Sequence, residues 1–286
     1  MDIFYILILM ILKFDLINYI EKYINKYYSN KYNFTYPNQK YTLIDLINAI
    51  ITITKIGCSY RDYQVINNWI NYKSLNRHMK FFSENNIFQN IYKQLLGKYF
   101  KTNKTNKLKY QLVDTTFIYN QYCVKNIGRN KFYKNKKGYK LSCLTDVNGI
   151  PISILIDSGN VYDGHFIEKH LDAMLIVTNT LKYKSHNRYK QYIMADSMYD
   201  SKKIRKLVED NGYTPIIDYN KRNNKYIYKV LTDNEKIKYK KRIKIENCFS
   251  WLKKNKRIKD LYDKLQITYL GYVYLAFSII LFNRLY

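Results

Sequence analysis

The chain has 286 residues, of which 49 are Lys or Arg and 22 are Asp or Glu, so that its net charge is +27 at neutral pH. So large a basic excess favours an anionic partner such as nucleic acid. The 47% share of hydrophobic residues, with only nine Gly and three Pro, argues against a disordered or fibrous chain. Part of the Lys excess, like the 33 Tyr, is also what an A+T-rich genome imposes on a coding sequence.

Residues 1–40 are predicted to form an N-terminal helical extension. The apolar run Ile3–Leu12 is only about ten residues long, roughly half of what a membrane-spanning helix needs. It follows an acid and lacks the basic region of a signal peptide. The four cysteines have no paired spacing, which predicts neither a zinc site nor a disulfide framework. We therefore expect an intracellular protein, neither secreted nor membrane-bound.

Residues 41–100 are predicted to form a small helical domain. Apolar residues recur with helical spacing from Ile44 to Ile51, and Gly57 is expected to end this helix. A second helix is predicted from Ser74 to Glu84, with the serine as its N-cap. These helices alone are too few to identify a DNA-binding motif.

The basic polar run KTNKTNKLK at 101–109 predicts a linker, after which residues 110–286 form a larger second domain. The first strand of this domain is predicted at the segment LVDTT. Leu112 and Val113 are apolar, and the two threonines favour an extended backbone. Asp114 is expected at the end of this strand, with its carboxylate directed out of the sheet.

A hairpin is predicted next. The strands Leu141–Asp146 and Ile152–Asp157 are joined by a turn that contains Gly149 and Pro151. Asp163 follows the hairpin and is interpreted as the N-cap of a helix.

A second acid is predicted at the carboxyl end of a strand. The apolar run Tyr192–Ala195 leads directly into Asp196. A helix from Ser201 to Asp210 and a strand from Thr214 to Asp218 are expected to follow. Asp196 is therefore a second candidate for a metal-binding carboxylate.

The most informative motif lies in the segment YKKRIKIENCFSWLKK. On one continuous α-helix, its Tyr239, Arg242, Glu246 and Lys253 would fall within roughly 60° of one another. A carboxylate between cations suits a divalent metal ion with phosphate-binding neighbours. The alternative is a basic solvated helix with this spacing by chance. The two aspartate motifs upstream favour the functional interpretation.

Together these motifs resemble those of the DDE transposases of insertion sequences, in the subgroup that carries Tyr-x2-Arg-x3-Glu-x6-Lys, similar to the IS-four and IS-five groups. The resemblance covers roughly residues 41–285. Two departures are notable. Ser197 and Met198 stand where a Lys or Arg and a Gly are usual, and Tyr60 stands where a Trp commonly precedes Arg-Asp.

The resemblance implies a mixed α/β fold, with an RNase H-like catalytic core and a small N-terminal all-helical domain that binds the ends of the element. It also implies that Asp114, Asp196 and Glu246 meet at one edge of the sheet and hold two Mg²⁺ or Mn²⁺ ions. These acids would catalyse cleavage at the element ends and transfer of the 3′-hydroxyl group into target DNA. The side chains that would contact the DNA are Tyr239, Arg242 and Lys253. The expected partners are the element ends, the target DNA and a second copy of the chain.

Three alternatives remain open at this stage. A metal-dependent nuclease or junction resolvase on the same fold would use similar acids but would not need the Tyr-Arg-Glu-Lys stripe. A domesticated or inactive copy would bind DNA without cutting it. A cationic structural or coat protein would owe its charge to composition alone, and it predicts that the three acids lie far apart.

Overall fold

A computed structural model describes most of the chain and divides it into two compact units. We name them the helical unit (Met1–Tyr99, Tyr122–Lys125 and Leu252–Tyr286) and the sheet unit (Phe100–Gln121 and Asn126–Trp251). The described residues are 3–30, 40–102, 107–120, 122–123, 125–180, 190–221 and 230–286. Residues 103–106 of the expected linker therefore lie outside the described part. The last 35 residues belong to the same unit as the N-terminal helices. The expected second domain, residues 110–286, is therefore divided between the two units.

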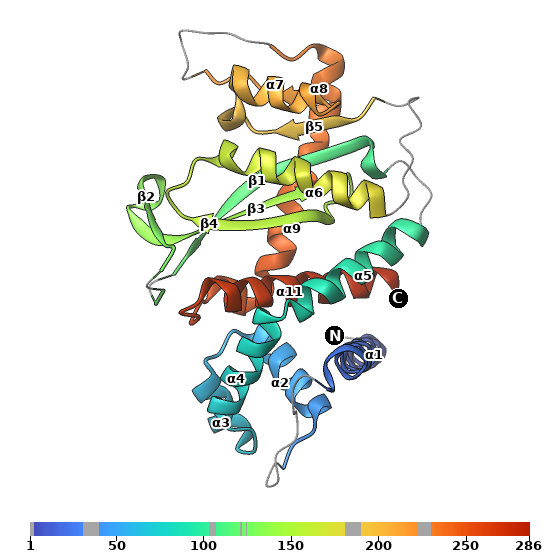
Figure 1. Cartoon of the computed structure of the whole chain (residues 1–286), viewed down its shortest axis with the longest axis vertical. Coiled ribbons are helices and arrows are strands. Elements are labelled where there is room, and N and C mark those ends of the chain that lie inside the picture. Colours follow the sequence, from blue (N-terminus) through green and yellow to red (C-terminus); the bar gives the residue numbers. More distant parts are fainter. Residues whose placement is uncertain are drawn as a thin grey trace. The chain divides into compact units, whose positions relative to one another are not determined.

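The helical unit is built around its last helix. Its helices are α1 (Ile3–Tyr28), α2 (Leu43–Ile56), α3 (Tyr60–Asn67), α4 (Tyr72–Glu84), most of α5 (Ile87–Thr102), α10 (Lys256–Lys259) and α11 (Gln266–Leu285) (Figure 1). Helix α11 packs most extensively against α4, and also against α1, α2 and α10. It is long and apolar enough to cross a membrane, but 72% of its most apolar window is buried inside the unit. Its hydrophobicity is therefore that of a core helix.

The ends of α2 are fixed by local hydrogen bonds. The Thr42 hydroxyl accepts from the backbone N–H of Asp45, and the Asp45 carboxylate accepts from the backbone N–H of Thr42. This reciprocal capping box satisfies two backbone donors that the first turn leaves open. Gly57 ends the helix with a φ of 76°, a left-handed conformation that glycine adopts without strain. The predicted stop at Gly57 is confirmed.

Helix α4 begins earlier than the sequence analysis expects. Its N-cap is Asn71, whose side chain accepts a hydrogen bond from the backbone N–H of Lys73. The predicted cap at Ser74 is wrong, because Ser74 already lies inside the first turn. Asn and Ser are comparable N-caps, so residue type alone does not decide between them.

The sheet unit has one six-stranded sheet with the order β4-β3-β1-β5-β6, and the short β2 also pairs with β3. Its strands are β1 (Tyr110–Tyr119), β2 (Gly128–Asn130), β3 (Lys136–Thr145), β4 (Pro151–Ser158), β5 (Tyr192–Ala195) and β6 (Thr214–Ile217). Strand β3 is antiparallel to both of its long neighbours, β1 and β4, whereas β1, β5 and β6 are parallel. This is the strand order of an RNase H-like sheet. The predicted mixed α/β fold is confirmed.

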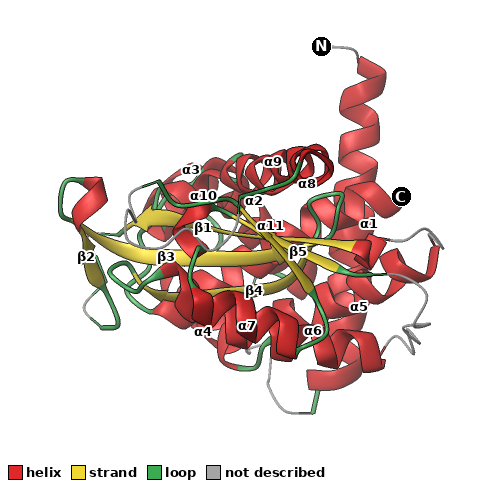
Figure 2. Cartoon of the chain, turned by 90° about the horizontal axis from the view of Figure 1, so that it is seen from above, coloured by secondary structure: helices red, strands yellow, loops and turns green. Residues whose placement is uncertain are grey.

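Helices cover both faces of this sheet. Helices α6 (Phe166–Thr180) and α7 (Lys202–Asp210) lie on one face, and α8 (Asp233–Tyr239) and α9 (Ile243–Lys253) lie on the other (Figures 1 and 2). Between α8 and α9 the residues Lys240–Arg242 form a 3-10 turn. The expected continuous α-helix from Tyr239 to Lys253 is therefore wrong at its start.

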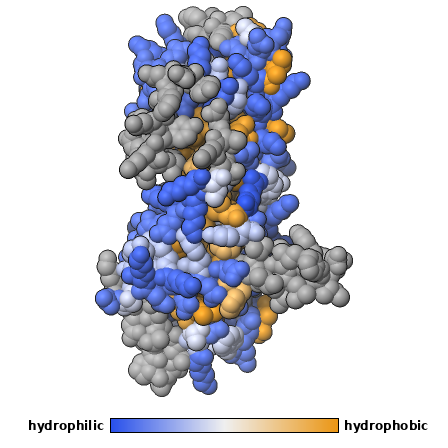
Figure 3. Space-filling view, turned by 90° about the vertical axis from the view of Figure 1, so that its right-hand side faces the viewer, coloured by the Kyte–Doolittle hydropathy of each residue, from blue (hydrophilic) through white to orange (hydrophobic). Residues whose placement is uncertain are grey.

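The face drawn in Figure 3 is mainly hydrophilic among its described residues. Hydrophobic side chains form scattered patches between the hydrophilic ones. This distribution agrees with a chain that carries 49 basic residues.

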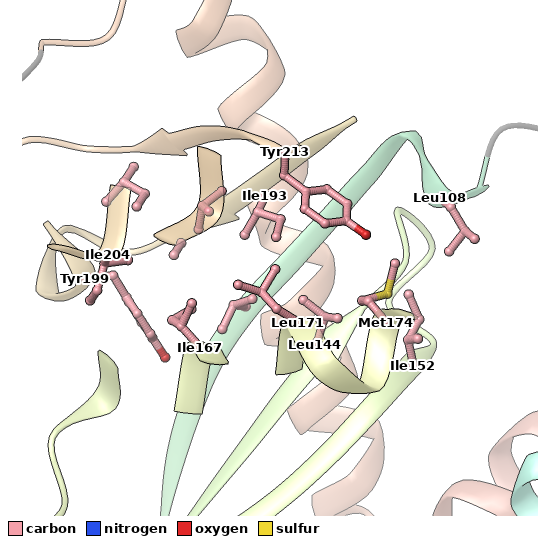
Figure 4. Close-up of a cluster of buried hydrophobic side chains, with 14 residues drawn as sticks. Leu108, Leu144, Ile152, Ile167, Leu171, Met174, Ile193, Tyr199, Ile204 and Tyr213 are labelled. Atoms are coloured by element: carbon pink, nitrogen blue, oxygen red, sulfur yellow. The ribbon is translucent and has the colours of Figure 1, made fainter. Parts of the chain in front are cut away.

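The core of the sheet unit lies between the sheet and helices α6 and α7 (Figure 4). Leu171 and Met174 of α6 meet Val208 of α7 and the strand residues Val113 and Ile193, and each of these side chains is at most 2% exposed. Burying one such side chain contributes about 1.5–3 kcal/mol. This packing fixes the relative positions of β1 and β5, which carry the first two candidate acids.

Candidate active site

Asp114 and Asp196 lie side by side because of the register of two parallel strands. The last pair between β1 and β5 is Val113 with Ala195, and each candidate aspartate is the next residue of its strand segment. Neighbouring strands are about 4.8 Å apart, so both carboxylates leave the sheet at one place. Asp114 is in the middle of β1 rather than at its end as expected, because β1 continues along β3 to Tyr119. It is nevertheless the point at which the β1–β5 ladder stops.

The Asp114 carboxylate is largely buried, with 20% of its side chain exposed. One oxygen accepts from the backbone N–H of Thr115 at 2.8 Å, and the other accepts from the Arg242 guanidinium at 2.9 Å. Burial, together with the negative charge of Asp196, raises the pKa of Asp114 to about 6 against the opposing effects of Thr115 and Arg242. A nearby positive charge therefore stabilises the ionised form of Asp114.

The Asp196 carboxylate caps the 3-10 turn Ser197–Tyr199 (η4). It accepts hydrogen bonds from both the backbone N–H and the hydroxyl group of Ser197, the latter at 3.0 Å. Ser197, one of the two departures from the family pattern, therefore orients the acid that precedes it. The carbonyl of Met198 accepts from the Tyr162 hydroxyl at 2.9 Å, which ties this turn to the segment before α6.

Arg242 joins the first and third candidate acids. One guanidinium nitrogen donates to Asp114, and another donates to Glu246 at 2.8 Å. Glu246 lies in the first turn of α9, one turn beyond Arg242, and half of its side chain is exposed. The positive end of the helix also stabilises a carboxylate at this position. Arg242 thus bridges two acids that are more than a hundred residues apart in sequence.

Tyr239 and Lys253, the ends of the predicted stripe, have different surroundings. The Tyr239 hydroxyl donates to the carbonyl of Ala195 at 3.3 Å, and burial raises the pKa of Tyr239 to about 12. Tyr239 therefore ties the end of α8 to the residue that precedes Asp196. Lys253 is the last residue of α9 and belongs to the helical unit. Burial, together with the charge of Lys259, lowers its pKa.

The three acids fit a divalent cation by chemistry. Carboxylate oxygens are the ligands that Mg²⁺ and Mn²⁺ prefer. Within the described part of the chain, no three His, Cys, Asp or Glu side chains lie close enough to hold a metal ion as they stand. The Arg242 guanidinium contacts both Asp114 and Glu246. Two of the three acids thus share the positive charge of Arg242, and burial of Asp114 favours a positive charge beside it.

The structure adds a charged pair that the sequence analysis missed. Asp163 accepts from the Thr115 hydroxyl at 3.0 Å and forms an ion pair with Lys140. It does not cap a helix, because the residue before the 3-10 turn that contains it is Tyr162. Its interpretation as an N-cap is therefore wrong. Asp163 holds the residue next to Asp114, and no periodicity in the sequence indicates this pairing.

Two further buried acids near the sheet have structural partners. Asp146 accepts from the backbone N–H groups of Asn148 and Ile150 and so closes the β3–β4 turn. Asp200 accepts from Arg205 through two nitrogens, at 2.9 and 2.7 Å. These bonds occupy their carboxylates and explain why neither acid belongs with the candidate set.

The profile of the transposase DDE domain family matches residues 107–268, which is more than half of the chain and includes all six predicted site residues. The chain belongs to the DDE transposase family. No curated protein matches this transposase. Among solved structures, the catalytic domain of Mos1 mariner transposase is similar at 12% identity, over 71% of this chain and 91% of that one, with a TM-score of 0.27. The fold of this transposase is identified from its own strand order, and not from this similarity.

Proposed function

We propose that this transposase cleaves DNA at the ends of its element and joins the freed 3′-hydroxyl group to target DNA, with two Mg²⁺ or Mn²⁺ ions. The observation that carries the proposal is the meeting of Asp114 and Asp196 where the β1–β5 ladder ends, with Glu246 linked to Asp114 through Arg242. Acids this far apart in sequence meet only through the fold. A chain whose charge came from composition alone would not bring them together.

The carboxylates of Asp114, Asp196 and Glu246 would hold the cations. When bound, such cations lower the pKa of a water molecule and stabilise the oxygen that leaves. In the cleavage step the water oxygen bonds to phosphorus, the bond from phosphorus to the 3′ oxygen breaks, and that oxygen takes up a proton. In strand transfer the 3′-hydroxyl oxygen of the element end loses its proton and bonds to a phosphorus of the target, while the bond from that phosphorus to the target's own 3′ oxygen breaks and this oxygen takes up a proton.

Arg242 has a second role in this proposal. With Asp114 and Glu246 engaged as metal ligands, the guanidinium donors of Arg242 would be available to a phosphate next to the scissile bond. The planar guanidinium fits phosphate oxygens in pairs, which suits this task better than a lysine would. Tyr239 acts as a positioning residue through its hydrogen bond to Ala195. Lys253 contributes a further phosphate contact.

The partners are part of the same proposal. Element ends and target DNA are the substrates, and residues 41–100 bind the ends. Joining two ends to one target requires two active sites, so we include a homodimer in the DNA complex. The protein acts inside the cell, on DNA, and the net charge of +27 supports this assignment.

The test is cleavage of a DNA fragment that carries the flanks of the transposase's own gene, in Mg²⁺ or Mn²⁺. Glu246→Gln keeps the size of the side chain but removes its charge, so we expect DNA binding to persist and cleavage to be lost. The matched control is Glu209→Gln on the exposed end of α7, which should cut like the wild type. Unimpaired cleavage by Glu246→Gln would refute the role of Glu246 as a metal-binding catalytic acid. Binding by both proteins with cleavage by neither would favour an inactive DNA-binding copy.

A further inference from the structure

The helical unit contains a cavity of about 640 Å³ that the catalytic proposal does not use. It lies between the start of α3, one side of α4 and the segment that joins α10 to α11. We name it the tyrosine cavity. Its walls and rim include three tyrosines and three cations: Tyr60, Tyr72, Tyr262, Arg61, Lys80 and Lys264. Cavities of roughly 300–1,000 Å³ are the size that binds small organic ligands.

One wall of the tyrosine cavity is built on a buried arginine. Arg257 is 1% exposed, and its guanidinium donates to the Asp263 carboxylate at 3.1 and 3.2 Å and to the carbonyl of Cys58 at 2.9 Å. The rings of Tyr60 and Tyr262 each lie 5.1 Å from this guanidinium. A buried ion pair costs desolvation and is rigid when its hydrogen bonds are made. Arg257 therefore fixes two of the aromatic walls.

The aromatic walls are held from several sides. The Tyr60 hydroxyl accepts from Tyr272 at 2.8 Å, and the Tyr262 ring stacks on Tyr122 at 5.8 Å with an interplanar angle of 19°. The Arg61 guanidinium lies 5.1 Å from the centre of the Tyr72 ring. Tyr262 nevertheless keeps 40% of its surface exposed. The cavity thus presents preformed aromatic surface to a planar ligand.

The rim of the cavity is positively charged. Arg61, Lys80 and Lys264 are all exposed. Among the described residues that line the cavity, Asp263 is the one acid, and its charge is matched by Arg257. Glu84, outside the lining, lies 3.7 Å from Lys80, and both of these side chains are about half exposed, so the pair is weak. A ligand of this cavity is therefore expected to be anionic as well as planar.

A nucleotide combines these two properties, because it has a flat aromatic base and a charged phosphate. A base inside a duplex is stacked and paired and cannot insert into a cavity of this size, whereas an unpaired base can. We propose that the tyrosine cavity binds one unpaired nucleotide, with its base among the tyrosine rings and its phosphate at the rim formed by Arg61, Lys80 and Lys264. This inference rests on DNA as the partner of the transposase but not on cleavage.

The nucleotide could belong to a DNA strand or be free in solution, and binding experiments distinguish the two. The full chain is titrated in EDTA, which prevents cleavage, against labelled duplexes of one sequence with either a blunt end or a short single-stranded overhang. We expect the overhang to bind about tenfold more tightly, as stacking of one base allows. A free deoxynucleoside monophosphate is titrated separately by calorimetry. If it also binds and displaces the overhang, the cavity accepts nucleotides from both sources.

Variants assign the preference to the cavity. The double variant Lys80→Ala, Lys264→Ala removes two exposed side chains, so the fold is preserved and the overhang preference should fall at least about fivefold. The matched control is Lys73→Ala, an exposed lysine of α4 that does not line the cavity. Tyr262→Ala should weaken the preference, and Tyr262→Phe, which keeps the ring, should retain it.

The inference is overturned if the wild type binds both duplexes equally and does not bind the mononucleotide, or if the double variant keeps the full preference. A protein that distinguishes the duplexes but does not cut the gene-flank fragment retains the cavity assignment and loses the catalytic one. A protein that cuts the fragment, but binds both duplexes equally and does not bind the mononucleotide, retains the catalytic assignment and loses the cavity assignment.

Discussion

Arg242 is the central residue of the candidate site. Its guanidinium donates to Asp114 and to Glu246, so it neutralises negative charge that the fold has gathered around a buried carboxylate. The same oxygens are the proposed metal ligands. In this proposal Arg242 and a metal ion would compete for the same carboxylates, so that binding of one would weaken binding of the other.

This competition gives a prediction for metal affinity. Arg242→Gln should bind Mn²⁺ about tenfold more tightly in the absence of DNA, because a positive charge next to the cation is removed and two carboxylates are released. Calorimetric titration with Mn²⁺ measures this directly. Lys244→Gln, an exposed lysine of the neighbouring α9, loses the same charge and should leave the affinity almost unchanged. Weaker Mn²⁺ binding by Arg242→Gln would contradict competition.

His170 links stability to pH. It is 1% exposed, and its ring nitrogens lie 2.8 Å from the hydroxyl of Ser142 and 2.9 Å from that of Ser153. Burial lowers the pKa of His170 to about 3 from its usual 6.5. Between these values the unfolded chain binds a proton that the folded chain does not. The free energy of unfolding therefore falls as the pH drops below about 6.5, by up to about 1.4 kcal/mol per pH unit.

His170→Gln isolates this contribution. The variant should be less stable than the wild type at pH 7 but should lose less stability between pH 7 and pH 5. Urea unfolding at the two pH values gives the difference. His78, whose pKa burial also lowers, is present in both proteins and cancels. An equal loss in both proteins would show that His170 is not the group responsible.

At the residue scale, the sequence predicts the candidate acids but not the contacts of their neighbours. Asp114 and Asp196 are predictable because apolar runs lead into them. The contacts of Asp163 with Thr115 and Lys140 are not predictable in this way. They depend on how far the loop after β4 reaches across the sheet, which no local pattern encodes.

At the scale of elements, the 3-10 turn Lys240–Arg242 separates Tyr239 from the rest of its motif. A 3-10 turn advances about 120° per residue instead of 100°, so three such residues rotate α9 by about 60° relative to its place on a straight α-helix. Tyr239 can thus contact the backbone of β5 while Arg242 contacts Asp114 on β1. The spacing of the motif identifies these residues, but a uniform helix misplaces them.

Short strands were predictable because they are apolar throughout. The run Tyr192–Ala195 gives the bounds of β5, and β6 ends at Ile217, one residue before the predicted Asp218. Parallel strands that are buried on both faces have this pattern. β1 is longer than expected because its second half is stabilised by pairing with β3, and pairing between distant segments is not a local property of sequence.

Two glycines in helical segments should respond oppositely to alanine. At Gly57 the φ of 76° disfavours alanine, and a Cβ atom would lie 2.7 Å from the Cβ of Lys256. Gly97, inside α5, has no neighbour within 4 Å of such an atom. We expect Gly57→Ala to destabilise the protein by more than about 1 kcal/mol and Gly97→Ala to stabilise it by about 0.5–1 kcal/mol. Thermal unfolding of both variants provides the measurement. A melting temperature for Gly57→Ala at or above that of the wild type would refute the role of Gly57.

At the scale of the whole molecule, the net charge determines how strongly the affinity for DNA depends on salt. With a net charge of +27, duplex binding should weaken steeply with salt because each neutralised phosphate releases counterions. If about 6–10 phosphates are contacted, affinity should drop roughly 10³–10⁵-fold between 50 and 200 mM salt. Fluorescence anisotropy over this range tests the prediction, and an unrelated duplex should give a similar slope. Affinity that does not depend on salt would argue against phosphate contacts.

The helical unit is discontinuous in sequence, since α2 and α4 pack against α11 from the far end of the chain, and Arg257 donates to the carbonyl of Cys58. Synthesis on the ribosome proceeds from the N-terminus, and domains generally fold as units. The sheet unit can therefore fold first. The N-terminal helices can complete their packing only after Leu252–Tyr286 has left the ribosome. The helical unit would therefore be the last part of the chain to fold. A product that terminates soon after Trp251 would contain the three acids but could not complete the helical unit.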